Sequence, residues 1–181
     1  MIDKFVEWQK RKYSQDQRAF LAVVLSSIFI FVFIPSIPLL FKDKIDKILA
    51  LPQIFVSPIN LHLGIPIAVS GLVLFLWTNF LFVKLGKGTQ TPIIPTQKLV
   101  TVGPFAYCRN PMYLGVILWV IGLGIILNSL SFILSGLIVP FLYLIYIKLI
   151  EEKELEVRFG RQYLEYKKKV PFIIPRLRNS L

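Results

Sequence analysis

The chain has 181 residues and a formal net charge of +11, and 55% of its residues are hydrophobic. Its mean hydropathy is +0.67, and the charged residues stand almost wholly outside a few long apolar runs, a pattern that excludes a soluble globular domain. The positive charge flanks these runs, so it fits lipid headgroups and membrane orientation better than nucleic acid. We therefore interpret residues 1–181 as a single all-α, polytopic membrane domain.

Cysteine and histidine usage narrows the chemistry further. Cys108 is the one cysteine, so no intramolecular disulfide and no CxxC pair can form. His62 is the one histidine, and it begins an apolar run, so we expect an interfacial polar residue. No metal site is predicted.

The first half of the chain predicts two membrane spans. Residues 1–18 mix charge with apolar side chains and read equally as a cytoplasmic tail or as a helix lying in the interface. The run 19–41 holds no charge before Lys42, which is enough to cross about 30 Å of hydrocarbon. Pro35 and Pro38 are expected to kink or end this helix. A loop over 42–60 and a second span over 61–83 follow, so the first two spans occupy 19–83.

The second half predicts a long loop, a helical hairpin and a C-terminal helix. The polar, proline-punctuated loop after Lys84 has about 27 residues. Loops of this length are uncommon in compact domains and are usually either functional or disordered. Apolar runs at 113–127 and 130–147, joined at Asn128 and Ser129, predict a tight hairpin, with close helix approach at Gly122, Gly124 and Gly136. Beyond Lys148 the apolar positions recur at helical spacing up to Pro171, and Gly160 is a candidate break.

The distribution of lysine and arginine predicts the orientation of these spans. The N-terminal tail holds five such residues, the middle loop counted from Lys84 holds four and the C-terminal segment holds nine, against three in the first loop. By the positive-inside rule, both termini and the long loop face the cytoplasm.

Residues 97–115 and the pair Glu151 and Glu152 stand out as a candidate site. The stretch QKLVTVGPFAYCRNPMYLG combines Arg109 with prolines, glycines and aromatic rings, and it runs directly into the hairpin. The two carboxylates end the hairpin on the same predicted side of the membrane. Ionisable residues at the end of a span are functional candidates by default, although capping the membrane end of the helix is an equal alternative for this pair.

These motifs resemble the isoprenylcysteine carboxyl methyltransferase and phospholipid methyltransferase superfamily. The similarity covers about 84–175 and rests on an Arg-x-Pro-x-Tyr-x-Gly element, a hairpin, and a later Glu-Glu pair, in that order. The resemblance implies an integral membrane methyltransferase that binds S-adenosylmethionine and methylates a lipophilic or lipid acceptor entering from the bilayer. It implies no nucleic acid and no obligatory protein partner.

The resemblance also assigns residues. The cofactor would be contacted by a first segment, a second segment and the acidic pair, namely Leu99, Val100, Gly103, Phe105, Asn110, Pro111, Met112, Tyr113, Glu151 and Glu152. The residues expected to take part in catalysis are Arg109, Tyr113 and Glu152. Aromatic faces for an adenine ring or a sulfonium would come from Phe105, Tyr107 and Tyr113.

Two positions depart from the family pattern. Asn110 stands where the pattern usually has histidine, and it keeps the capacity to donate a hydrogen bond. Ile147 stands four residues before the first acid, where the carboxyl methyltransferases carry an arginine that would hold the substrate carboxylate. Because an arginine fork is the natural partner of a carboxylate, this difference favours a phospholipid-amine acceptor over the alternative, an isoprenylcysteine carboxyl group.

Two other classes stay open at this stage. Membrane sterol reductases, which use NADPH, share a form of the Arg-x-Pro-x-Tyr element but should need more basic residues and a larger bundle. A non-catalytic membrane scaffold would need no paired motifs.

Overall fold

The computed structural model describes residues 15–53, 55, 57–89 and 95–175. The predicted interfacial helix over 2–13 lies outside these residues. Within the described residues the chain is helical, with no strand beyond an isolated bridge between Thr89 and Pro95. The predicted all-α, polytopic class is confirmed.

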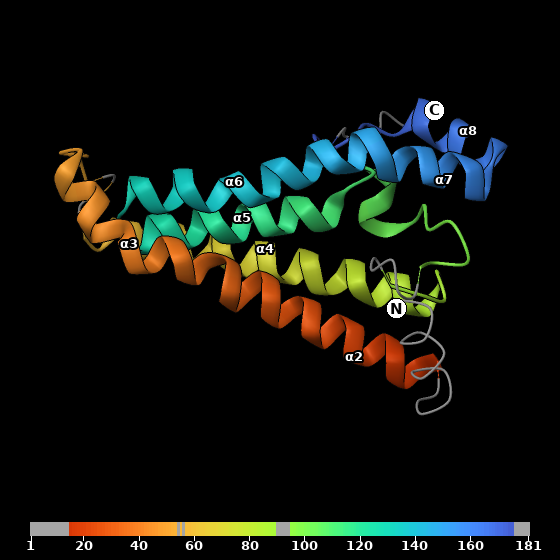
Figure 1. Cartoon of the computed structure of the whole chain (residues 1–181), viewed down its shortest axis with the longest axis horizontal. Helices are drawn as coiled ribbons and strands as arrows, with labels where there is room; N and C mark the ends of the chain where they lie inside the picture. The colour runs from red at the N-terminus through yellow and green to blue at the C-terminus, as the bar shows by residue number, and fades with distance from the viewer. Residues whose placement is uncertain (1–14, 54, 56, 90–94, 176–181) are drawn as a thin grey trace, which may run out of the picture.

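The first helix is longer than predicted. Helix α2 (Gln15–Ile28), a π-helical turn η1 (Phe29–Phe33) and α3 (Ile34–Ile48) follow one another as one continuous helix (Figure 1). We predicted that this helix kinks or ends at Pro35 and Pro38 and is followed by a loop from residue 42. That boundary was wrong, because the helix continues past both prolines to Ile48. The wide turn explains this, because Ile34 N–H bonds to Phe29 C=O, five residues back, just before a proline that has no N–H to give.

Three further helical stretches complete the bundle. They are α4 (Ile59–Lys84), α5 (Pro111–Ile126), and α6 (Leu130–Tyr146), which continues through a second π turn η3 (Ile147–Glu151) into α7 (Glu152–Phe159). Three apolar stretches of the described chain are long enough to cross a membrane: Val23–Ile48, Ile59–Lys84 and Leu130–Phe159. The fourth predicted span is α5, whose 16 residues give a helix of only about 24 Å.

Small residues let α4 and α5 pack backbone to backbone. A Cβ on Gly71 would lie 2.5 Å from Gly115 C=O and 2.6 Å from Trp119 N, and one on Gly64 would lie 2.8 Å from Gly122 C=O. Such close approach is how helices associate inside a bilayer, where apolar burial gives little drive. We predicted that Gly122 lets the two hairpin helices approach closely. This prediction is corrected, because Gly122 lies against Ala68 of α4 and not against α6.

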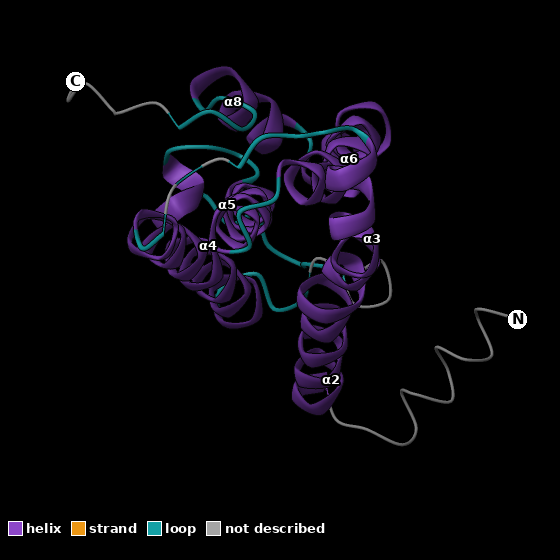
Figure 2. Cartoon of the chain, turned by 90° about the vertical axis from the view of Figure 1, so that its left-hand side faces the viewer, coloured by secondary structure: helices purple, strands orange, loops and turns teal. Residues whose placement is uncertain are grey.

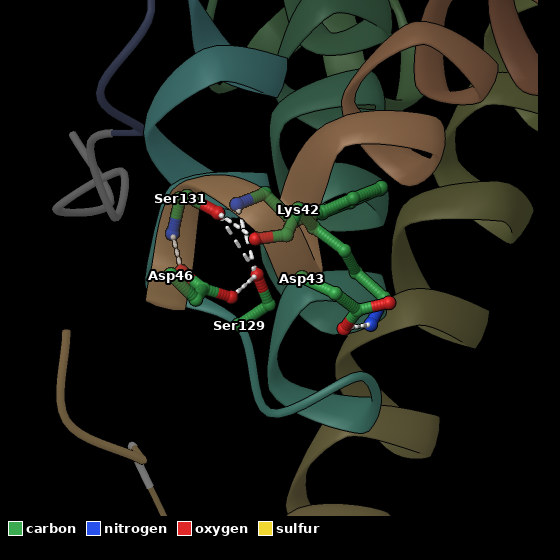
Figure 3. Close-up of polar contacts among 6 residues, drawn as sticks. Lys42, Asp43, Asp46, Ser129 and Ser131 are labelled. Atoms are coloured by element: carbon green, nitrogen blue, oxygen red, sulfur yellow. Dashed lines mark hydrogen bonds and ion pairs between the residues drawn. The ribbon is translucent and has the colours of Figure 1, made fainter. Parts of the chain in front are cut away.

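The hairpin turn is fastened to the preceding helices at the end of the bundle away from the C-terminal helices (Figure 3). Asp46, near the end of α3, accepts hydrogen bonds from the Ser129 hydroxyl and from Ser131 N–H at 3.1 Å. Ser129 also caps α6 by accepting from Phe132 N–H at 3.2 Å. Asn128 has φ +52° and exchanges two hydrogen bonds with the backbone of Phe55, at 3.0 and 2.8 Å. These contacts fix the predicted corner and, with it, the alignment of α5 and α6.

The short α5 leaves space at the opposite end of the bundle. There α4 and the α6–α7 stretch extend past the start of α5, and the long loop lies beside them with the 3₁₀ turn η2 (Gly103–Ala106) (Figure 1). Helix α8 (Arg161–Lys169) folds back over the same end, and Figure 2 shows it above α5 in the end-on view. The predicted break at Gly160 is confirmed, because α7 ends before it and α8 begins after it.

Candidate active site

A pocket opens at the start of α5, where five separate parts of the chain meet. Its empty space is about 630 Å³, part of it open to solvent. The walls come from the end of α4, the long loop, the first turn of α5, the α6–α7 stretch and α8, and the lining residues are Phe82, Leu99, Val100, Phe105, Arg109, Asn110, Pro111, Met112, Tyr113, Ile147, Glu151, Leu155, Tyr163 and Tyr166.

Most of the residues predicted to contact a cofactor line this pocket. The first segment contributes Leu99, Val100 and Phe105, and the second contributes all four residues from Asn110 to Tyr113. Two of the predicted residues, Gly103 and Glu152, lie outside the lining. Tyr107, one of the three predicted aromatic faces, is also outside it and is 46% exposed.

Gly103 shapes the loop instead of facing the pocket. Its φ is +62°, a conformation that favours glycine, and it begins the turn η2. A Cβ here would lie 3.0 Å from Leu81 and 3.5 Å from Trp77 of α4, so the glycine lets the loop rest against that helix. The turn then presents Phe105, which packs with Leu81, Val100 and Phe82 in a small buried cluster.

Glu152 forms a buried ion-pair network behind the pocket. Its side chain is only 5% exposed, and its two carboxylate oxygens lie 3.0 Å from Arg109 Nη2 and 2.7 Å from Lys167 Nζ. Lys167 also donates to Glu156 at 2.9 Å. The network joins the loop, α7 and α8, and it connects Glu152 to the pocket residue Arg109.

Arg109 presents unused donors at this site. Its side chain is 10% exposed, and beyond the ion pair with Glu152 its Nε and Nη1 atoms are buried without a hydrogen-bond partner. A buried donor left unpaired costs roughly 1–3 kcal/mol, and more for a charged group, so these two donors are available to water or to a ligand that accepts hydrogen bonds. The chemistry that fits is an anionic, oxygen-bearing group.

The two adjacent acids lie at the end of the π turn η3 and have different surroundings. The turn widens the helix, so that Glu152 N–H bonds to Ile147 C=O five residues back. Glu151 is half-buried on the pocket wall, whereas Glu152 is turned into the ion-pair network. Neighbouring residues of a helix do not share a face, so the two carboxylates meet different partners, and the π turn lies where this helix reaches the pocket.

Two tyrosines of α8 belong to the site, although the sequence placed them only on the apolar face of a helix. Tyr166 Oη donates to Phe105 C=O at 2.7 Å, which holds α8 against the loop. Burial raises the pKa of Tyr163 and of Tyr166 well above the ordinary value, and the nearby carboxylate of Glu152 raises that of Tyr163 further. Both hydroxyls therefore stay protonated at neutral pH and serve as donors. The predicted helix break at Gly160 is the sequence signal that could have placed these two tyrosines at the pocket.

The residues after α8 return to the start of α5. Arg109 N–H donates to Pro171 C=O at 2.9 Å, and Asn110 Nδ2 donates to Phe172 C=O at 2.9 Å. The guanidinium of Arg109 also lies 5.8 Å from the centre of the Phe172 ring. Asn110, which replaces the usual histidine, therefore uses its amide to fasten the C-terminal segment over the site.

Tyr113 connects the pocket to the outer face of α6. Its ring stacks on Tyr143 with centroids 5.0 Å apart, and Tyr143 in turn contacts Tyr146 at 5.3 Å. Tyr143 and Tyr146 are each 39% exposed. These rings form an aromatic path between the pocket and the surroundings of the bundle.

Comparison with known proteins identifies the family. A model of the phospholipid methyltransferase family matches residues 59–162, which is more than half of the chain, and the chain belongs to this family. The matched region contains α4, the loop, the hairpin and α7, the parts that build most of the pocket.

Individual relatives carry a more specific name. Protein-S-isoprenylcysteine O-methyltransferase from Mus musculus is 37% identical over 83 residues, and the similarly named proteins of Arabidopsis thaliana (form B) and Schizosaccharomyces pombe are 38% and 40% identical over 80 residues. The matches cover 42–44% of this chain. They span only 28%, 40% and 33%, respectively, of the relatives' own lengths.

Proposed function

We propose that this chain catalyses S-adenosylmethionine-dependent methylation of a lipophilic acceptor at the membrane surface. The observation that carries the proposal is the pocket itself, which gathers both predicted cofactor segments and Glu151 around the buried Arg109. Family membership favours methyl transfer over the sterol reductase and scaffold alternatives.

The pocket residues fit this cofactor. Arg109 has two buried donors without partners, which suit the carboxylate of an amino acid. Leu99, Val100 and Phe105 offer an apolar and aromatic wall for an adenine ring. Bound there, the cofactor would supply a methyl group already activated on a sulfonium. The chain then has to align the acceptor and exclude water, and Tyr163 and Tyr166 close the pocket from the α8 side.

For the acceptor we infer a carboxylate of the prenylated cysteine type. The names of the relatives support a carboxylate acceptor. They favour the carboxyl alternative over the phospholipid-amine acceptor that Ile147 suggested. Ile147 is 1% exposed and lines the pocket, so that position offers no cation. Among the described residues that line the pocket, Arg109 is the one arginine. It can bind the carboxylate of the cofactor or of the acceptor. A carboxylate is already ionised at neutral pH and needs no base.

Phospholipid-amine methylation is the second candidate. It needs a group that takes a proton from an ammonium, and Glu151, half-buried on the pocket wall, has the right chemistry and position for this step. The absence of an arginine at Ile147 also fits a neutral acceptor. In either case the acceptor would enter from the bilayer along Tyr143, whose exposed ring stacks on Tyr113 of the pocket.

Methyl-labelled S-adenosylmethionine distinguishes these candidates. The purified protein in lipid would be incubated with an N-acylated S-prenylcysteine or with phosphatidylethanolamine, and the organic-soluble product would be treated with mild alkali. We expect label from the prenylcysteine that alkali releases as methanol, since an ester is base-labile. Base-stable label from phosphatidylethanolamine would support the second candidate, and no label with either acceptor would contradict both.

Single substitutions test the roles within the pocket. Arg109→Lys keeps the charge but loses the planar fork, so we expect cofactor affinity to fall at least tenfold. Glu151→Gln removes a predicted cofactor contact in both reactions but a proton acceptor only in amine methylation, so it should lower methylation of an amine more than methylation of a carboxylate. Arg161→Gln is the matched control, because Arg161 is 91% exposed and pairs only with Glu165 one turn along α8 within the described chain.

A further inference from the structure

A second cavity lies beside Arg109, at the C-terminal end of α8. Its empty space is about 740 Å³, part of it open solvent, and it is lined by Arg109, Lys167, Lys168, Lys169, Val170, Pro171, Ile174 and Pro175. Four of these eight residues are cationic, and no acidic side chain lines the cavity in the described chain. The methyl-transfer pocket and this cavity share Arg109 as their common wall.

The charges of the cavity are only partly compensated. Lys167 is held by Glu152 at 2.7 Å and Glu156 at 2.9 Å, and hydrogen bonds to these carboxylates raise its pKa. Lys168 and Lys169 are exposed and form no ion pair with any described residue. The cavity therefore offers at least two ammonium groups to an outside anion.

Apolar side chains border the same cations. Ile174 in the cavity rim is 78% exposed, and Leu164, one helical turn before Lys168 on α8, is 45% exposed. Exposed aliphatic residues beside lysines are typical of a surface that lies in the membrane interface. A free phosphate or a nucleic acid would use the lysines but would leave these aliphatic side chains in water.

We propose that this cavity binds the phosphate-bearing headgroup of an anionic membrane lipid. The headgroup phosphate accepts hydrogen bonds from Lys168 and Lys169, and the lipid's glycerol and acyl portions lie along Ile174 and Pro175. Lys168 and Lys169 do not line the methyl-transfer pocket, so the lipid site does not depend on the acceptor that the pocket takes. Polybasic segments at a membrane surface gain affinity from each lysine, which gives the site its preference for anionic over zwitterionic lipid.

Native mass spectrometry of the full chain in an uncharged detergent measures this binding. Short-chain phosphatidylglycerol and phosphatidylcholine would be titrated separately, and we expect the apparent Kd for phosphatidylglycerol to be about tenfold lower. The double variant Lys168→Gln/Lys169→Gln should raise the Kd for phosphatidylglycerol about tenfold. Both side chains are exposed, so the variant should fold, and circular dichroism would verify its helix content.

The control is Lys44→Gln/Lys47→Gln, which removes the same charge from α3 at the other end of the bundle and should leave the Kd unchanged. Equal affinity for the two lipids, or equal loss in both double variants, would overturn the proposal. Competition by glycerol phosphate at the same concentration as the lipid would show a free-phosphate site, and tighter binding of polyuridylate would show a nucleic-acid surface. Either result would also overturn the lipid assignment.

Discussion

At the scale of single residues, the Arg109 and Glu152 pair holds the site in place. The two side chains are 10% and 5% exposed, and Glu152 is the carboxylate that compensates the charge of Arg109 within the described chain. Removing one partner of a buried ion pair typically costs about 3–5 kcal/mol, because the other charge stays buried alone. We expect Glu152→Leu to lower the free energy of unfolding by an amount of this order, because Arg109 loses its carboxylate partner while Lys167 keeps Glu156.

A double substitution separates charge compensation from chemistry. Arg109→Met/Glu152→Leu removes both charges, so it should recover part of the stability lost in Glu152→Leu while cofactor binding stays lost. Chemical denaturation of the detergent-solubilised variants measures the first effect, and equilibrium binding of the cofactor measures the second. A double variant no more stable than Glu152→Leu would show that the pair is not coupled.

Cys108 gives a prediction about pH. The residue is 1% exposed, and burial raises the pKa of its thiol to about 11 from an ordinary value of 9.0. Between these two values the unfolded chain loses the thiol proton while the folded chain keeps it. The unfolded state then binds fewer protons, so the free energy of unfolding falls as pH rises through this window and is unaffected well below it.

The comparison of wild type with Cys108→Ala isolates this effect. Tyr163 and Tyr166 lower stability at high pH in both proteins, so the difference between the two denaturation profiles from pH 8 to pH 11 reports the thiol alone. We also expect the native thiol to resist maleimide at pH 7.5 and to react once denatured. Rapid labelling of the native protein would contradict the burial on which the pH prediction rests.

At the scale of elements, the break at Gly160 sets the position of α8. Gly160 has φ +54° and ψ −130°, which side-chain-bearing residues rarely adopt, and nothing lies within 4 Å of an added Cβ. Gly160→Ala should therefore cost about 1–3 kcal/mol through backbone conformation alone. It should also favour a continuous helix that moves Tyr163 and Tyr166 away from the pocket and weakens cofactor binding. Arg161→Ala, at the next and exposed position, is the control. Equal cofactor affinity in Gly160→Ala and wild type would show that α8 does not complete the site.

The elements also show what sequence reasoning could and could not reach. Helical periodicity and apolar runs placed the hairpin, its corner at Asn128 and the break at Gly160, because these depend on local sequence. The π turn η1 and the continuation of the first helix beyond residue 41 to Ile48 were missed, since a π turn is a backbone arrangement with no periodicity of its own. The separate surroundings of Glu151 and Glu152 were missed because the partners of Glu152, Arg109 and Lys167, come from distant parts of the chain. The lining role of Tyr166 depends on a contact with Phe105, 61 residues earlier, that only the folded chain reveals.

At the scale of the whole molecule, the bundle has two distinct ends. One end carries the candidate site with the long loop, α7 and α8, and the other carries the hairpin corner and the last turn of α3 (Figure 1). Lysine and arginine are concentrated at the first end, so the positive-inside rule predicts that the site faces the cytoplasm. A cytoplasmic site would have access to a soluble methyl donor and, from the side, to lipids of the same leaflet.

Single cysteines at the two ends test this orientation. In a Cys108→Ala background, Lys47→Cys reports the corner end and Lys98→Cys reports the loop, and both lysines are exposed in the structure. A membrane-impermeant maleimide added to intact cells should label position 47 at once and position 98 only after the membrane is permeabilised. The reverse labelling pattern would place the site on the non-cytoplasmic face of the membrane, away from the soluble methyl donor of the cytoplasm. Labelling of both positions in intact cells would mean that the four apolar helices do not separate the two ends across a bilayer.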